Sequence, residues 1–266
     1  MTRLGRLSLT AALILAGAAA LAQEAPPTER PPARPEMIEA EPEPPAADDA
    51  ADAQEPAPQE GELIGPPAPP AWFTIAGSDA DHAACLSLLR RGGATFTEPP
   101  PIAEAEAWDC GIARPVQVTR LLRGVELPDA PILRCQTALA LAGWTRDFLV
   151  PAARAVSDDA PLTALRTGPG YVCRDRVGTG DADPPPSEHA LGNAIDVMSF
   201  ELEGREPLPV RPRAEDGDAD AAFQRAAQAT GCLFFTTVLG PGSNAAHDDH
   251  LHLDLSQRSS GWRVCD

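Results

Sequence analysis

Two short histidine-rich stretches constrain the fold of this chain more than any other feature of its sequence. The first is Ser187–Asp196 (SEHALGNAID) and the second is His247–Asp254 (HDDHLHLD). Together they contain four of the five histidines in the chain. Imidazole and carboxylate groups are typical zinc ligands. If both stretches contribute ligands to one ion, two segments that are far apart in the sequence must lie side by side.

The pattern around the first stretch predicts a strand. In AIDVM (Ala194–Met198), the isoleucine and the valine are expected to face a core, which turns Asp196 to the opposite side. Gly192 permits a tight entry into this strand, so that His189 can fold back toward the Asp196 side chain.

The second stretch alternates polar and apolar residues, as a half-buried strand does. His250, His252 and Asp254 are therefore expected to share one face, with Leu251 and Leu253 packed beneath them.

If the two strands are neighbours, three ligands converge: His189, Asp196 and one histidine of the HLH pair. Three protein ligands leave a fourth position for water, as in catalytic zinc sites. Taken singly, each histidine could be an ordinary loop or surface residue. Their combination with Asp196 and Gly192 favours a metal site.

The two stretches also resemble a known motif. Ser187-x-His189-x-x-Gly192-x-Ala194-x-Asp196 followed by His250-x-His252 resembles the zinc motif of the LAS metallopeptidases over residues 171–254. That group includes D-alanyl-D-alanine carboxypeptidases, penicillin-insensitive murein endopeptidases and, as a relative, the Hedgehog signalling domain. With the upstream sequence GYVCR (Gly170–Arg174), the cysteine-containing region from near Phe73 to Asp266 is more closely similar to the bacterial extensin-like C-terminal domain family.

The resemblance implies an LAS/Hedgehog-like fold and a zinc ion held by His189, Asp196 and His252. It implies hydrolysis of D-amino-acid-containing peptide bonds in peptidoglycan, by a carboxypeptidase or an endopeptidase. Two alternatives stay open: a zinc-containing module that binds cell-wall peptide without cutting it, and a structural envelope protein.

Three residues are candidates for the general base. LAS peptidases commonly place a glutamate three residues before the last zinc histidine, and Asp249 occupies that position here. The spacing His247-x-x-His250-x-His252 instead resembles the murein endopeptidase, in which additional histidines surround the metal. His250 is slightly favoured because strand alternation places it beside His252.

Three residues are candidates for contacts with substrate. Arg174 could stabilise a tetrahedral oxyanion or bind a terminal carboxylate, or it could form an ordinary salt bridge. Tyr171 belongs to the element that resembles Gly-Tyr-Arg in the carboxypeptidases, with two residues inserted before the arginine. Ser187 could donate to the substrate backbone or cap a turn.

The first part of the chain predicts export. Residues 1–22 combine Arg3 and Arg6 with an apolar run and the small-x-small sequence Ala20-Leu21-Ala22, as a cleavable secretory signal does. Residues 23–72 are expected to be a disordered, proline-rich, acidic linker. Of residues 23–70, 14 are proline, and 12 acidic side chains oppose 2 basic ones. A periplasmic or secreted protein without stable membrane insertion is expected.

Residues 73–266 are predicted to form one α+β domain with a mostly antiparallel sheet. Helices are expected at 78–92, 131–155 and 219–230, and strands at 116–122, 162–165, 170–173, 194–200 and 233–238. An even number of cysteines in an exported domain predicts three disulfides, with a weak preference for a Cys85–Cys110 pair. The six are Cys85, Cys110, Cys135, Cys173, Cys232 and Cys265.

The charge of the chain argues against one class of partner. The formal net charge is −18, and no basic cluster interrupts it, so nucleic acid is not an expected ligand. We expect a monomer whose partner is a peptidoglycan peptide.

Overall fold

The computed structural model describes residues 69–156, 160–177, 181–259 and 261–266. The expected signal peptide and nearly all of the expected linker lie outside these residues. The first described element is the short helix α1 (Ala71–Thr74). Ala71 and Trp72, which the sequence assigned to the linker, are therefore part of this helix.

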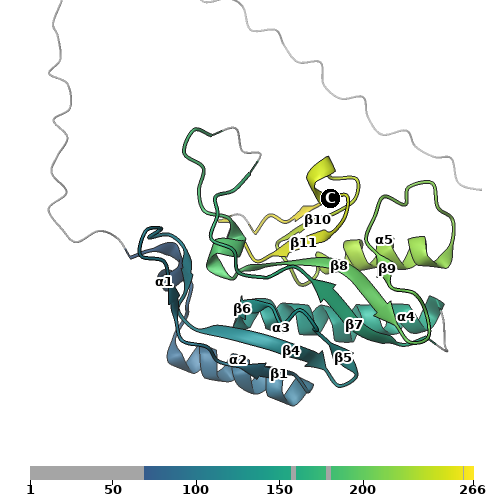
Figure 1. Ribbon diagram of the computed structural model, residues 1–266, viewed down its shortest axis with the longest axis horizontal. Coiled ribbons are helices and arrows are strands. Elements are labelled where there is room, and N and C mark those ends of the chain that lie inside the picture. The colour runs from purple at the N-terminus through teal and green to yellow at the C-terminus, as the bar shows by residue number, and fades with distance from the viewer. Residues whose placement is uncertain (1–68, 157–159, 178–180, 260) are drawn as a thin grey trace, which may run out of the picture. The chain divides into compact units, whose positions relative to one another are not determined.

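A large sheet forms the centre of the described part of the chain (Figure 1). Its strand order is β1-β4-β5-β7-β8-β11-β10-β12, with β6 beside β4 and β9 beside β8. Only the pairs β5–β7 and β10–β12 are parallel among the described strands, which confirms the predicted α+β class with a mostly antiparallel sheet. The strands are β1 (Thr95–Thr97), β4 (Pro115–Leu122), β5 (Val125–Glu126), β6 (Ile132–Arg134), β7 (Leu162–Thr167), β8 (Ala194–Leu202), β9 (Leu208–Pro209), β10 (Thr237–Leu239), β11 (Leu251–Asp254) and β12 (Val264–Cys265). A separate hairpin pairs β2 (Ile102–Ala103) with β3 (Gly111–Ile112).

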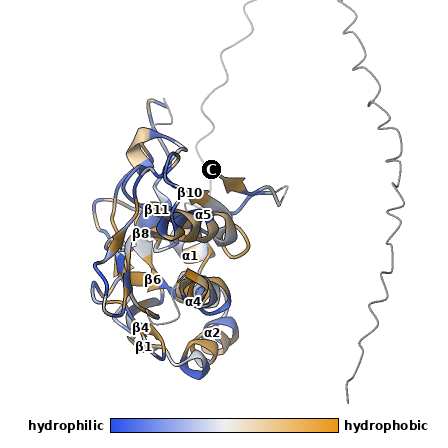
Figure 2. Cartoon of the chain, turned by 90° about the vertical axis from the view of Figure 1, so that its right-hand side faces the viewer, coloured by the Kyte–Doolittle hydropathy of each residue, from blue (hydrophilic) through white to orange (hydrophobic). Residues whose placement is uncertain are grey.

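Helices cover one face of the large sheet and enclose the core. They are α2 (Asp79–Gly92), α3 (Cys135–Trp144), α4 (Val150–Val156) and α5 (Ala219–Gly231). Figure 2 shows α2, α4 and α5 on the same side of the strands. The largest fully buried side chains include Trp144, Phe200, Phe223 and Phe235, which lie between the two layers. Because the core lies on the helical side of the sheet, the opposite face can carry polar side chains.

Capping residues set the ends of the predicted helices. Ser78 and Asp81 form a capping box at the start of α2, and Gly93 ends the helix with a φ of 91°. Asp218 accepts a hydrogen bond from the backbone N–H of Ala221 at the start of α5. The predicted helices 78–92 and 219–230 are confirmed.

The predicted helix 131–155 is wrong at its start and interrupted in its middle. Ile132–Arg134 forms β6, because these residues pair with β4 instead of continuing a helix. A π-helical segment, Thr145–Leu149, then separates α3 from α4. Pro151 has no N–H to donate, and the wider π turn just before it lets the chain restart as a helix.

Two predicted strands also differ. Residues 170–173 are irregular, and of the segment 233–238 only Thr237 and Val238 lie in a strand, β10. Phe234 and Phe235 both donate their backbone N–H groups to the Gly231 carbonyl, which keeps them in a turn after α5 and out of the sheet.

Three disulfides join the six cysteines of the described residues, as the sequence predicted. The pairs are Cys85–Cys135, Cys110–Cys173 and Cys232–Cys265. The suggested Cys85–Cys110 pair is wrong, because Cys85 on α2 packs against the start of α3. The even count predicted the pairing of all six, but only the packing of the helices chooses the partners.

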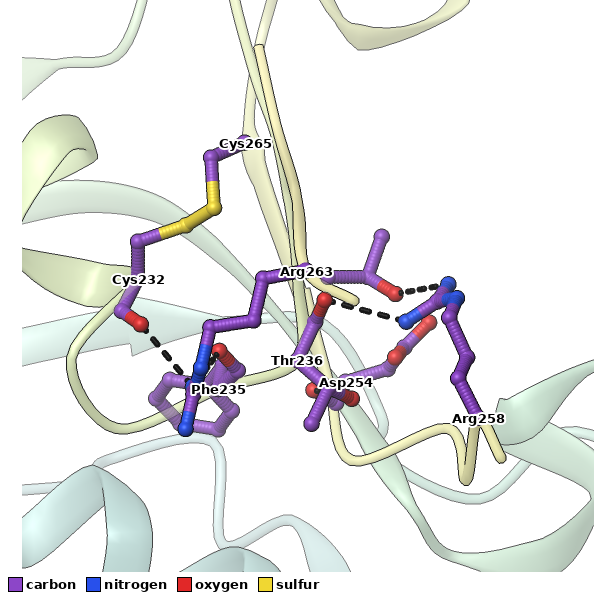
Figure 3. The surroundings of a disulfide bond; sticks show 8 residues. Cys232, Phe235, Thr236, Asp254, Arg258, Arg263 and Cys265 are labelled. Carbon is purple, nitrogen blue, oxygen red and sulfur yellow. Dashed lines mark hydrogen bonds between the residues drawn. A yellow bond between two sulfur atoms is a disulfide. The ribbon is translucent and has the colours of Figure 1, made fainter. Parts of the chain in front are cut away.

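The Cys232–Cys265 disulfide joins the C-terminal strand β12 to the end of α5 (Figure 3). The Arg263 guanidinium donates to the carbonyls of Cys232 and Phe235, at 2.9 and 2.6 Å. Arg258 donates to the Thr236 carbonyl at 3.0 Å, and the Thr236 hydroxyl donates to the Asp254 carbonyl at 3.3 Å. These bonds support β10 and β11 from the outer edge of the sheet.

Gly192 is a position where the backbone conformation and the close packing both exclude a larger residue. Its φ is 62°, and an added Cβ would overlap the Ile112 side chain and come within 3.1 Å of the Arg134 backbone nitrogen. Its carbonyl accepts from the Arg134 N–H at 2.8 Å and from the Thr137 hydroxyl at 3.0 Å. The turn into β8 is therefore packed on all sides.

We expect Gly192→Ala to destabilise the fold by about 3 kcal/mol, because it adds steric overlap to a left-handed backbone. Gly204→Ala is the matched control, since Gly204 has a φ of 69° with nothing within 4 Å of an added Cβ. It should cost only about 1 kcal/mol. Guanidinium unfolding curves of both variants measure the difference, and equal midpoints would contradict this account of Gly192.

Candidate metal centre

The register between β8 and β11 places the two histidine-rich stretches together. In this antiparallel pair, His252 lies directly opposite Asp196, while Leu253 lies opposite Ile195. Ile195 and Leu253 are fully buried, and Asp196 and His252 face the other side of the sheet. The predicted proximity of the two strands and the direction of their side chains are confirmed.

A short 3-10 helix, Glu188–Leu191, carries His189 to the same place. The Ser187 hydroxyl caps it by accepting a hydrogen bond from the His189 backbone N–H at 3.4 Å. Gly192 ends it in a left-handed conformation. The chain thus turns sharply into β8, and the His189 side chain, only 2% exposed, folds back over the start of that strand.

Three potential ligand atoms converge at this point. His189 Nε2 lies 3.2 Å from His252 Nδ1 and 3.3 Å from Asp196 Oδ1, and the last two atoms are 2.9 Å apart. Ligands bound at 2.0–2.2 Å to a tetrahedral ion lie roughly 3.3–3.6 Å from one another. Within the described residues, these three side chains are the group that could hold a metal ion.

The remaining nitrogen of each histidine has its own acceptor. His189 Nδ1 lies 2.8 Å from the Gly170 carbonyl, and His252 Nε2 lies 3.3 Å from Asp254 Oδ2. In the neutral imidazoles, donation from these nitrogens leaves lone pairs on His189 Nε2 and His252 Nδ1, which lie 3.2 Å apart. Such outer hydrogen bonds are typical of zinc-bound histidines. The residues present therefore fit a divalent zinc ion.

Hydrogen bonds among the site residues shift the pKa values of Asp196 and His252. Burial raises the pKa of Asp196, but hydrogen bonds from His189 and His252 outweigh burial and hold that pKa well below its usual range. Burial lowers the pKa of His252, yet its hydrogen bonds to the carboxylates of Asp196 and Asp254 raise it to about 9. A bound cation would replace the positive charge that a proton on His252 supplies between these carboxylates.

Two further histidines border the three ligands. His250 Nε2 lies 3.7 Å from Asp196 Oδ1, and its Nδ1 lies 2.8 Å from Asp249 Oδ1. His247 Nδ1 lies 2.8 Å from the Asn244 side-chain oxygen, and its ring is 5.2 Å from that of His250. Each ring is thus held by one polar partner at Nδ1. The structure brings all three predicted base candidates to the site, with Asp249 exposed and bonded to His250.

The three predicted substrate contacts lie around the same loop. Arg174 is exposed and lies near His247. Burial lowers the pKa of His247, and the positive charge of Arg174 is among those that lower it further. Ser187 is buried and serves as the helix cap. The Tyr171 hydroxyl bonds Glu104 at 3.1 Å, and burial together with Glu104 raises the pKa of Tyr171 to about 12. Tyr171 therefore points its hydroxyl at a carboxylate of the neighbouring hairpin.

A polar network supports the His189 turn from behind. Arg134 donates to the Asn193 side-chain oxygen, and Asn193 donates to Glu188 Oε2 at 2.7 Å. Arg176 contacts the other oxygen of Glu188 at 3.2 Å. Burial lowers the pKa of Arg134 to about 10, with an opposing contribution from Glu188. The network fixes the backbone of the residues on both sides of His189.

Sequence reasoning missed several of these supporting residues. Asp254 was placed on the face of His252 but given no role, although a carboxylate two residues along the same strand face is a readable signal. Gly170 acts only through its carbonyl, and Arg134 reaches the site from a different strand. No local sequence pattern indicates either contribution.

A protein-family model covers most of this chain. The family model for the extensin-like protein C-terminus matches residues 83–266, which is more than half of the chain. No curated protein and no solved structure matches the chain. In the described part of the chain, no helix has the length and apolar character needed to cross a membrane. Three disulfides are typical of proteins from oxidising compartments. The chain belongs to the extensin-like C-terminal family.

Proposed function

We propose that this domain is an exported zinc peptidase that hydrolyses D-amino-acid-containing peptide bonds of peptidoglycan. The observation that carries the proposal is the convergence of His189 Nε2, His252 Nδ1 and Asp196 Oδ1, with both remaining histidine nitrogens fixed by outer acceptors. The choice of bond follows the resemblance to LAS peptidases, and an LAS/Hedgehog-like fold is part of the proposal. The periplasm or cell exterior is the proposed location, in accord with the disulfides.

His189, Asp196 and His252 would hold the ion. A zinc ion with three protein ligands supplies Lewis acidity, which acidifies water and polarises a substrate carbonyl at neutral pH. Asp254 and the Gly170 carbonyl keep the two imidazoles in the orientation and tautomer that ligation requires.

His250 is the best-placed general base. Asp249 accepts a hydrogen bond from the Nδ1–H of His250, which leaves His250 Nε2 as an acceptor on the side of Asp196. Asp249 itself is directed at His250, so it orients the imidazole and does not take the proton directly. His247 is held in the same way by Asn244, but its lowered pKa makes it a weaker proton acceptor.

Arg174 would stabilise negative charge on the substrate. Its guanidinium is exposed near His247, and its only described hydrogen bond is a long one, 3.4 Å, to the Asp175 carbonyl. A cation placed there could pair with a developing oxyanion or with a terminal carboxylate of the peptide.

We expect the zinc-loaded chain to release peptide fragments or D-alanine from purified muropeptides, detected by mass spectrometry. His189→Ala should abolish the release because it removes a ligand, and His250→Gln should lower kcat about 100-fold or more with zinc still bound. Zinc binding without any cleavage would contradict the peptidase and indicate a module that only binds cell-wall peptide.

Two aspartate variants should separate metal binding from proton transfer. Asp254→Asn weakens the support of His252 and should lower zinc affinity roughly 10–100-fold in a chelator competition. Asp249→Asn leaves all three ligands and their supports intact, so zinc affinity should stay unchanged while kcat falls. Equal effects of both variants on zinc affinity would contradict these assigned roles.

Zinc affinity should rise with pH. Because the pKa of His252 is about 9, a proton occupies this imidazole at neutral pH and must leave before Nδ1 can bind a cation. Below that pKa, release of one proton predicts about a tenfold gain in affinity per pH unit. Competition titrations between pH 6 and pH 8 test this, and an affinity that does not change with pH would contradict it.

A further inference from the structure

Three aromatic residues lie at and beside the loop of the β2–β3 hairpin. We call Trp72, Phe73 and Trp108 the aromatic platform. Phe73 is 58% exposed and Trp108 is 61% exposed, while Trp72 is half-buried. The Trp72 and Phe73 rings meet edge to face at 6.0 Å, and Trp72 Nε1 donates to the Trp108 carbonyl at 3.0 Å. Clustered exposed apolar residues mark binding surfaces more often than scattered ones do.

The platform is rigidly attached to the domain. Gly111 on β3 allows the Trp72 ring to lie directly on the hairpin, since an added Cβ would come within 2.9 Å of that ring. Cys110, the residue before Gly111, is buried and forms a disulfide with Cys173. A backbone held in this way limits the conformational entropy that the binding surface loses when it takes up a ligand.

The same attachment connects the platform to the candidate active site. Cys173 is followed directly by Arg174, and the nearby Val172 N–H donates to the His189 carbonyl at 3.3 Å. The Tyr171–Glu104 hydrogen bond joins the same two segments a second time. A ligand that contacts both the platform and the candidate metal ligands must therefore be a polymer that extends along these joined segments.

The surroundings of Trp108 select a type of ligand. Glu104, Glu106 and Asp109 are all exposed within four residues of it, and no basic residue occurs in the sequence of residues 104–112. Carboxylates accept hydrogen bonds from hydroxyl and acetamido groups but repel phosphates of lipids and nucleic acids. The apolar C–H face of a pyranose ring can stack on an indole or phenyl ring, whose π face is negative.

We propose that the aromatic platform binds the glycan strand of the polymer whose peptide enters the metal centre, through N-acetylated hexosamine rings stacked on Trp108 and Phe73. The choice of polysaccharide rests on the proposed function, because peptide and glycan belong to the same peptidoglycan. Glu104, Glu106 and Asp109 would accept hydrogen bonds from the sugar hydroxyl and amide groups.

The test separates glycan binding from hydrolysis. The full chain is titrated with a β-1,4-linked N-acetylglucosamine hexamer, which has no peptide to cleave, and binding is measured by calorimetry. We expect Trp108→Ala and Phe73→Ala each to weaken binding about fivefold or more. Trp262→Ala is the matched control, because Trp262 is 69% exposed and lies in the C-terminal segment. It should leave hexamer binding unchanged.

A second measurement uses the proposed reaction. Trp108→Ala should raise KM for sugar-bearing muropeptides and leave kcat/KM for the sugar-free stem peptide unchanged. Circular dichroism verifies that the variants are folded. A peptide copying residues 42–58 of this chain serves as the competing proline-rich ligand, since such segments also bind aromatic surfaces.

Each outcome decides one proposal. Failure of the hexamer to bind, equal binding by Trp108→Ala, or preference for the proline-rich peptide would overturn the glycan surface even if muropeptides are cleaved. Hexamer binding that depends on Trp108 in a chain that cleaves nothing would instead overturn the peptidase and retain the glycan surface.

Discussion

The antiparallel pairing of β8 with β11 is the constraint on which the candidate site depends. It sets Asp196 opposite His252 and buries Ile195 and Leu253 on the far face. A shift of one residue in this register would turn the polar side chains into the core and the leucine toward solvent, which burial of apolar area opposes. The same hydrophobic contacts that stabilise the sheet therefore fix the separation between ligand atoms.

Polar groups around the candidate ligand residues hold their side chains in position. His189 and His252 each use one nitrogen for an outer hydrogen bond, and the His189 turn is supported by Arg134 through Asn193. In a partly buried environment these bonds are stronger than in water and leave each imidazole little freedom. The arrangement resembles the preorganised ligand sets that bind metals tightly, since little reorganisation is needed on binding.

The disulfides extend this order to the surface around the site. Cys110–Cys173 joins the loop that carries Tyr171 and Arg174 to the hairpin that carries Trp108, and Cys232–Cys265 holds the C-terminal segment beside β10. A domain of this kind can keep irregular loops in fixed positions because covalent links restrict them. Such loops would hold the candidate metal centre and the proposed glycan surface in fixed positions.

The sequence by itself determined the class of the fold, the central strands and the residues that converge at the candidate metal centre. Alternation in the HLH stretch predicted which side chains share a face, and the capping residues predicted α2 and α5, because these signals are local and periodic. Only the tertiary structure decided the disulfide partners, the strand β6 and the roles of Gly170, Arg134 and Asp254. Those features arise where segments that are distant in the sequence meet. The local sequence pattern does not indicate which backbone carbonyl accepts a hydrogen bond or which segments pack together.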